Sequence, residues 1–164
     1  QGVNYRAASD SDLEFALRRL ARWDESTSGE SVAQLKTVLQ TTMQNNFGVF
    51  RSEQHMRAGI VQLAELRTRI ANAHLTDKSH AFNTARMEAL ELDNLLEVAE
   101  ATAITAEARR ESRGAHARDD YQERDDVNWL CHSLYVPHSR SVGKRAVNFA
   151  PHLVEPMQPT VRQY

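Results

Sequence analysis

The sequence is poor in cysteine: Cys131 is the only one among 164 residues. A single thiol cannot close an internal disulfide, so we expect a fold stabilised by its core in a reducing compartment. The sequence also lacks any apolar run that approaches membrane-spanning length, and no signal peptide is visible at its start. From these absences we expect a protein that is neither inserted in a membrane nor stapled by disulfides.

Glycine is scattered, with six residues and no cluster. A dinucleotide or phosphate loop needs grouped glycines between a strand and a helix, because only bare backbone can approach a pyrophosphate closely. We therefore expect no flavin or nucleotide to be bound by this chain alone. The net charge of −2 likewise gives no electrostatic basis for binding nucleic acid.

No catalytic or metal-ligand spacing is present either. The seven histidines do not form the short pairs that a transition-metal site uses, so we expect no metal centre. Ser112 or Ser133 beside His116 or His132 is conceivable as a nucleophile and base, but neither serine lies on a strained strand-to-helix turn. Cys131 lies in an alternating segment and is interpreted as a small packing residue.

What the sequence does contain is ordinary globular composition with strong helical periodicity. Hydrophobic residues make up 41% and charged residues 26%, which suits one domain with a real core. We expect a first helix opened by residues 9–12, with Ser11 and Glu14 in a capping box, and ended by residues 26–29. We expect a second helix capped by Ser31 and broken at residues 45–48, a third from about 53 to 72, and the longest from 83 or 84 to 113 or 114.

Apolar stripes along these helices indicate which faces are buried. In the first helix the stripe is Leu13, Leu17 and Leu20, and after the second helix Phe47, Val49 and Phe50 form an apolar plug. Alanines dominate the second half of the longest helix, so we place that half at the centre of a bundle. A charged side chain there would need a partner.

After the helices the periodicity changes. Residues 130–136 alternate as a strand does, residues 137–143 suit a loop, and residues 145–149 suit a returning strand. Such a hairpin must pack on something to be stable. The predicted fold is mainly α, a three- to four-helix bundle with a C-terminal irregular extension and a short β-hairpin. We assign residues 1–114 to the bundle and residues 115–164 to a docking loop, hairpin and proline-containing tail of the same domain.

The segment between the bundle and the hairpin, residues 109–130, interleaves arginines with aspartates; we call it the hinge. One interpretation is that its Arg113, His116 and Arg118 orient an anionic substrate. The other, which we favour, is that they cap the long helix, pair with nearby aspartates and dock this domain onto a neighbour. The predicted interdomain docking residues are Arg113, His116, Arg118, Asp119, Asp120 and Arg124.

The hinge also carries a family resemblance. Residues 111–120 read ESRGAHARDD, residues 124–126 read RDD and residues 128–135 read NWLCHSLY. Upstream, residues 43–47 read MQNNF, residues 82–84 read FNT and residues 91–95 read ELDNL. In this order, these motifs closely resemble the C-terminal part of the succinate dehydrogenase flavoprotein subunit, in a family that includes fumarate reductase and L-aspartate oxidase.

The resemblance implies that the chain is the C-terminal helical domain of an enzyme that oxidises succinate to fumarate. It implies FAD in the parent subunit and none in this fragment. Its implied partners are the flavin-binding domain of the same subunit, the iron–sulfur subunit and a flavin-attachment assembly factor, with no nucleic acid and no direct membrane insertion. The family's catalytic and flavin-linking residues have no matching position here, so we expect the fragment to be inactive.

The same resemblance bears on the extent and the location of the protein. The chain begins at Gln1 without a methionine, from which we expect a fragment. The form of residues 129–135 resembles bacterial members of the family, which implies the cytoplasmic side of the inner membrane, reached through partner subunits. The alternatives are a C-terminal domain of fumarate reductase or L-aspartate oxidase, or a free-standing helical module that binds an acidic partner through the hinge.

Overall fold

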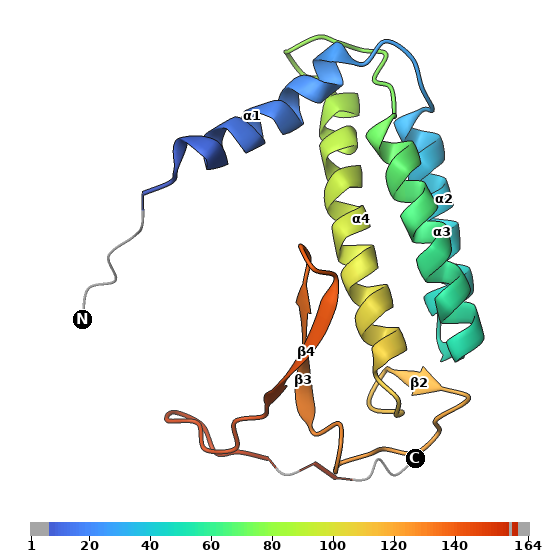
Figure 1. Ribbon diagram of the computed structural model, residues 1–164, viewed down its shortest axis with the longest axis vertical. Helices are drawn as coiled ribbons and strands as arrows, with labels where there is room; N and C mark the ends of the chain where they lie inside the picture. The colour runs from blue at the N-terminus through green and yellow to red at the C-terminus, as the bar shows by residue number, and fades with distance from the viewer. Residues whose placement is uncertain (1–6, 158, 161–164) are drawn as a thin grey trace.

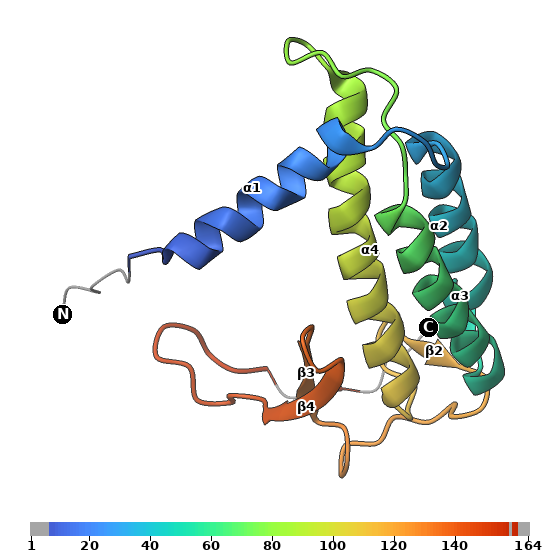
Figure 2. The same cartoon turned by 45° about the horizontal axis from the view of Figure 1, so that its top comes forward.

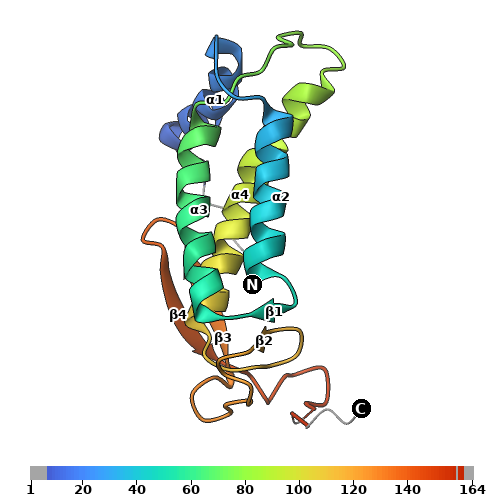
Figure 3. The same ribbon diagram turned by 90° about the vertical axis from the view of Figure 1, so that its right-hand side faces the viewer.

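Three long helices form the body of the molecule, and a fourth projects from one end of it (Figures 1 and 3). The structure is a computed structural model that describes residues 7–157, 159 and 160. Its helices are α1 (Asp10–Glu25), α2 (Val32–Phe47), α3 (Glu53–Ala71) and α4 (Thr84–Ala108). The fold is mainly α with a small hairpin, as the sequence predicted.

Polar side chains set the starts of the helices. Ser31 caps α2, as predicted, and Asn83 caps α4, which starts within the predicted bounds; each side-chain oxygen accepts a backbone N–H of the first turn. The prediction for α1 was wrong by two residues. Ser9 is the cap, and it forms the capping box with Asp12 instead of Ser11 with Glu14, since the Ser9 hydroxyl and the Asp12 carboxylate each accept the other residue's N–H.

The core lies between α2, α3 and α4. Its largest fully buried apolar side chains are Trp23, Leu35, Met56, Leu63, Leu66, Ile70 and Leu92. Ala99, Ala103 and Ala106 are also buried, which confirms that the alanine-rich half of α4 is central. The charge predicted to need a partner there is Glu100, which is 2% exposed and accepts hydrogen bonds from Arg67 of α3 and from Arg140.

Helix α1 does not lay its apolar stripe on this core. It diverges from the bundle and meets α4 only near its C-terminal end, where Trp23 is buried (Figures 1 and 2). Leu13, Leu17 and Leu20 are 58%, 54% and 45% exposed, so the prediction that this stripe is covered is wrong for the chain by itself.

The predicted apolar plug after α2 is also wrong. Phe47 is buried, but Val49 and Phe50 are 70% and 75% exposed. The reason is that residues 50–51 form a short strand, β1 (Phe50–Arg51), which pairs in parallel with β2 (Ala117–Arg118) of the hinge. Phe47 reaches the core because Gly59 of α3 has no side chain there: a Cβ would lie 2.4 Å from the Phe47 ring.

Helix α4 ends at Ala108, five residues before the predicted end at residues 113 or 114. Arg109 is already extended, and Gly114 takes its positive φ of 58° in a tight turn between Arg113 and His116. A glycine cap is unnecessary, because the guanidinium of Arg118 supplies donors for the last carbonyls of the helix.

A β-hairpin follows the hinge, as predicted, and packs beside α4 (Figure 1). It consists of β3 (Cys131–Val136) and β4 (Ser141–Ala146), in antiparallel register. The predicted loop over 137–143 is too long and the second strand begins earlier than predicted, because Arg140 adopts a left-handed φ of 51° that closes the turn tightly. In the described part of the chain, no helix is long and apolar enough to cross a bilayer.

Candidate functional site

The hinge is organised around a buried carboxylate, Glu111. Its side chain is 0% exposed and accepts hydrogen bonds from the guanidinium groups of Arg109 (2.5 Å) and Arg113 (2.8 and 3.0 Å) and from the N–H of Asp125 (2.9 Å). Burial by itself would raise the pKa of Glu111, but these donors outweigh it and hold the pKa below its usual value. Glu111 is therefore ionised, and it holds Arg109 and Arg113 at the start of the hinge close to Asp125 near its end.

Arg118 closes the end of α4. It is 2% exposed, and its Nη1 donates to the carbonyls of Ala106 (3.4 Å), Glu107 (3.0 Å) and Arg109 (3.2 Å). Its Nε and Nη2 each lie 2.7 Å from a carboxylate oxygen of Asp120, a bidentate pair. A cation at the C-terminal end of a helix also interacts favourably with the helix dipole.

Asp120 extends this link to the start of α3. Its Oδ2 accepts the N–H of Glu53 at 2.8 Å, one of the unpaired donors of the first helical turn. The Arg118 guanidinium, and then the Glu53 N–H, lower the pKa of Asp120 to about 2. One ion pair thus joins the end of α4 to the beginning of α3.

His116 bridges the two β-strands of this end. Its Nδ1 lies 2.9 Å from Nη1 of Arg51, which has no lone pair to offer, so Nδ1 is the acceptor. Its Nε2 lies 3.1 Å from the carbonyl of Arg109 and must donate. His116 is therefore a neutral imidazole protonated on Nε2, and burial together with the charges of Arg51, Arg118 and Arg109 lowers its pKa.

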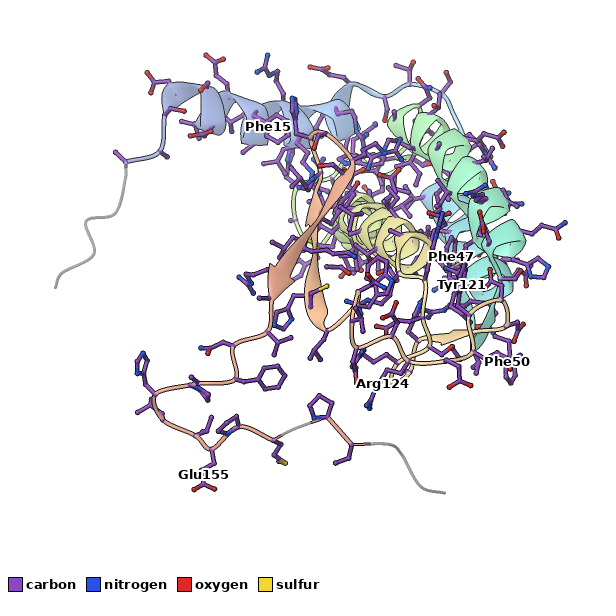
Figure 4. All side chains as sticks on the ribbon, turned by 60° about the horizontal axis from the view of Figure 1, so that its bottom comes forward. Phe15, Phe47, Phe50, Tyr121, Arg124 and Glu155 are labelled. Atoms are coloured by element: carbon purple, nitrogen blue, oxygen red, sulfur yellow. The ribbon has the colours of Figure 1, made fainter. Side chains whose placement is uncertain are left out.

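The remaining predicted docking residues lie further out. Arg124 pairs with Asp126 at 2.8 Å and donates to the carbonyl of Thr160 at 2.9 Å, at the edge of the hinge loop (Figure 4). Asp119 is exposed, and its N–H donates to the carbonyl of Arg51 at 2.8 Å.

These contacts decide part of the interpretation of the hinge. Helix capping is confirmed for Arg118, which donates to α4 carbonyls, and is wrong for Arg113, whose guanidinium donates to Glu111 and Asp126. Pairing with an aspartate is confirmed for both, because Arg118 pairs with Asp120 and Arg113 with Asp126. Docking onto a neighbour stays a prediction. The charges of Arg113 and Arg118 are already matched by carboxylates inside this chain.

A second candidate surface is the apolar face of α1. Leu13, Leu17 and Leu20 lie on one side of this helix and are 45–58% exposed; Phe15, which is 66% exposed, lies on another side, because two residues turn a helix by about 200°. Phe15, which is labelled in Figure 4, also lines a groove of about 370 Å³ between α1, α3 and α4, together with Leu96 and Ile70. Contiguous exposed apolar residues of this kind mark interaction surfaces. The sequence contains the stripe, but its periodicity does not say whether the covering surface belongs to the same chain.

A third feature is a polar hollow of about 370 Å³ beneath the hairpin, where His116 meets Arg51, Arg109 and β3. Sequence reasoning missed Arg51 altogether. It lies between Phe50 and Ser52, outside any charged cluster, and only the β1–β2 pairing brings it to the hinge.

Neither a metal nor a flavin fits the residues described. Within residues 7–157 and 159–160, no group of three or more His, Cys, Asp and Glu side chains is placed to hold a metal ion. The glycines of that part lie in five separate places, and none links a strand to the first turn of a helix as a pyrophosphate loop requires.

Comparisons with known proteins give one consistent result. The family model described as the C-terminal part of fumarate reductase flavoprotein matches residues 36–164. The succinate dehydrogenase flavoprotein subunit of Coxiella burnetii is 45% identical over 98% of this chain and 27% of its own length. The fumarate reductase flavoprotein subunit of Haemophilus influenzae is 34% identical over 100% of this chain and 27% of its own length.

A solved structure agrees with these relatives. One chain of a quinol–fumarate reductase with menaquinol molecules superposes with a TM-score of 0.76 and 31% identity, over 95% of this chain and 28% of that one. The chain thus spans about a quarter of the length of the curated relatives that it matches.

Proposed function

This chain belongs to the family of C-terminal domains of fumarate reductase and succinate dehydrogenase flavoproteins, and from that premise we propose that it is the docking domain of a succinate-oxidising flavoprotein subunit. The parent would oxidise succinate to fumarate on FAD and pass the electrons to an iron–sulfur subunit. The observation that carries this proposal is the 45% identity over 98% of the chain to a succinate dehydrogenase flavoprotein subunit.

A fumarate reductase is the second candidate for the parent. It is supported by 34% identity over the whole chain to the Haemophilus influenzae flavoprotein subunit and by the superposition on quinol–fumarate reductase. The choice between the two directions depends on residues outside this chain.

In the proposed role, the chain provides a contact surface and a rigid support for the parent subunit and does not itself take part in the reaction. The exposed face of α1 would be covered by the flavin-binding part of the same subunit, since removing Leu13, Leu17 and Leu20, which are 45–58% exposed, from water is favourable. The hinge residues would support that contact by holding α3, α4 and the hairpin in one arrangement. Residues 1–114 and 115–164 would then act as one unit.

The other partners follow from the family. We propose contacts with the iron–sulfur subunit and transient contact with a flavin-attachment assembly factor. The parent would lie on the cytoplasmic face of a bacterial inner membrane, held there by other subunits. The described part of this chain contributes no spanning helix of its own.

Co-elution tests the docking role. The purified chain is mixed with the remainder of the flavoprotein and run on a sizing column. We expect a complex with the wild-type chain, and a folded but non-binding chain when Leu13 and Leu17 are both replaced by Ser. Val61→Ser is the matched control, because Val61 is 58% exposed but lies on α3. Equal binding by all three chains would contradict a docking role for α1.

Activity provides an independent check. The isolated chain should be folded, colourless and without succinate oxidation with artificial electron acceptors. A retained flavin spectrum, or measurable turnover, would show that this chain carries chemistry of its own.

A further inference from the structure

The polar hollow beneath the hairpin is lined by cations and hydroxyl groups, and no acidic side chain of the described residues lines it. It lies where the last turns of α4, the β1–β2 pair and β3 meet. Its lining residues are Arg51, Thr102, Thr105, Arg109, His116 and Ser133, with Ala106, Cys131 and His132 completing it.

Arg51 differs from the other arginines that are buried or partly buried in residues 7–157 and 159–160. Each of those others has a carboxylate within 4 Å: Arg19, Arg22, Arg67, Arg86, Arg109, Arg113, Arg118 and Arg124. Arg51 is partly buried, and no described carboxylate forms an ion pair with it. Its charge is therefore uncompensated within this part of the chain.

The partners that Arg51 does have are all neutral. Its Nε donates to the carbonyls of Phe47 (3.2 Å) and Gly48 (3.0 Å), and its Nη1 donates to the neutral ring of His116 (2.9 Å). Burial lowers the pKa of Arg51, yet a guanidinium keeps its proton at any ordinary pH. These bonds fix the orientation of the fork, and its Nη2 has no described partner.

Neighbouring groups add a second donor without adding net charge. The Oγ of Ser133 accepts from Nη2 of Arg109 at 3.3 Å and keeps its own proton free to donate. The positive charge of Arg109 is already matched by Glu111 at 2.5 Å. The hydroxyl protons of Thr102 and Thr105 are used on the carbonyls of Val98 and Ala101.

We infer that this hollow is a carboxylate-binding site, in which Nη2 of Arg51 and the hydroxyl of Ser133 donate to the two oxygens of one carboxylate. One uncompensated positive charge matches a monovalent anion, whereas a phosphate dianion would leave charge unmatched. Two sources can supply the group: an Asp or Glu side chain of the flavin-binding part, which rests on the proposed docking function, or a free small carboxylate.

Acetate is the probe that tests the site. The isolated chain, which has a core built from its own residues, is titrated with sodium acetate while the NMR signals of His116 and Ser133 are followed. A parallel titration with sodium chloride at the same ionic strength is the control. We expect saturable shifts with acetate and none with chloride. Arg51→Gln should weaken acetate binding at least about tenfold, equivalent to about 1.4 kcal/mol. Arg69→Gln removes an exposed arginine that pairs with Glu30, away from the hollow, and should bind as the wild type does.

Two further variants keep the test valid if Arg51→Gln fails to fold. Arg51→Lys retains the charge but loses the fork, and Ser133→Ala removes the second donor, so each should weaken binding by a smaller factor than Arg51→Gln. Linear, unsaturated shifts in the wild type, or wild-type affinity in every Arg51 variant, would overturn the inference.

The same titration on the full-length flavoprotein identifies the source. If a side-chain carboxylate fills the hollow there, the His116 signal will start at its acetate-bound position and acetate will have no effect. If the site serves a free carboxylate, the full-length protein will respond as the isolated chain does. Co-elution does not depend on acetate, so failure of the docking proposal would be seen separately from failure of this one.

Discussion

The two ends of the molecule treat burial in opposite ways. At the hinge end, charged groups are buried: Glu111 and Arg118 are 0% and 2% exposed, and each is surrounded by donors or acceptors of this chain. At the α1 end, apolar groups are exposed: Leu13 and Leu17 are 58% and 54% exposed. Glu111 and Arg118 are stable in the interior because their partners are already present, whereas an exposed apolar face gains stability only when something covers it.

The contrast assigns a different task to each end. The ion pairs that bury Glu111 and Arg118 are formed among the described residues, and with neighbouring hydrogen bonds they join α3, α4 and the hairpin. In helix α1 only the side chain of Trp23 is buried, at 0% exposed, and the exposed leucines of the helix remain available to a partner. Mutations at the hinge should therefore cost stability, and mutations on the α1 face should cost binding. Four predictions test this division.

The largest effect is expected at the buried end of α1. Trp23→Ala removes a fully buried indole that joins α1 to the bundle and leaves a large cavity, so the free energy of unfolding should fall by about 3–5 kcal/mol. Urea denaturation followed by circular dichroism measures this. Phe15→Ala is the control on the same helix, since Phe15 is 66% exposed. Similar losses for both would mean that α1 is packed along its whole length.

Next is the centre of the hinge. Glu111→Gln leaves Arg109 and Arg113 without their shared charge partner, so unfolding should become easier by about 3 kcal/mol. Glu97→Gln is the matched control, because Glu97 pairs with Arg67 but its side chain is 49% exposed, and it should cost less than about 1 kcal/mol. Equal small losses would show that the hinge charges are effectively solvated.

A smaller, pH-dependent effect is expected at Asp120. Its folded-state pKa of about 2 lies below the unfolded value of 3.8, so the folded state favours the ionised form. The resulting stability is fully present above pH 3.8 and is lost as the pH falls through about 2. Because the side chain is 29% exposed, we expect a contribution of about 1 kcal/mol. In Asp120→Asn, the free energy of unfolding should fall by about 1 kcal/mol less between pH 4 and pH 2 than it does in the wild type, as measured by urea denaturation at each pH. An unchanged pH dependence would exclude the pair with Arg118 as the source of this stability.

The sequence predicts where the helices start better than it predicts the contacts made by the segments that follow them. The Ser31 cap and the start of α4 at residue 83 or 84 depend on local signals and were predicted correctly. The end of α4 was not, because Arg118, ten residues beyond Ala108, supplies the cap from a distance in sequence that no local pattern reveals. Arg51 was missed for the same reason.

Exposure of the α1 stripe was out of reach for a different physical reason. The spacing of Leu13, Leu17 and Leu20 predicts that one face of the helix is buried. The same spacing is expected whether the burying surface belongs to this chain or to a partner. Likewise, the interleaved charges of the hinge correctly indicate ion pairs, but their order along the sequence does not say which pairs are buried.

The smallest effect on stability is expected for Leu17→Ser on the exposed face of α1. The side chain is 54% exposed and makes no part of the buried core, so the free energy of unfolding of the isolated chain should change by less than about 0.5 kcal/mol. Leu35→Ser on α2, where the side chain is 0% exposed, should cost several times more and provides the scale. When the remainder of the flavoprotein is present, the order should reverse for binding, because Leu17 then becomes part of the covered interface. A large loss of stability in the isolated chain would place the α1 face in the core after all, and the division between the two ends would no longer hold.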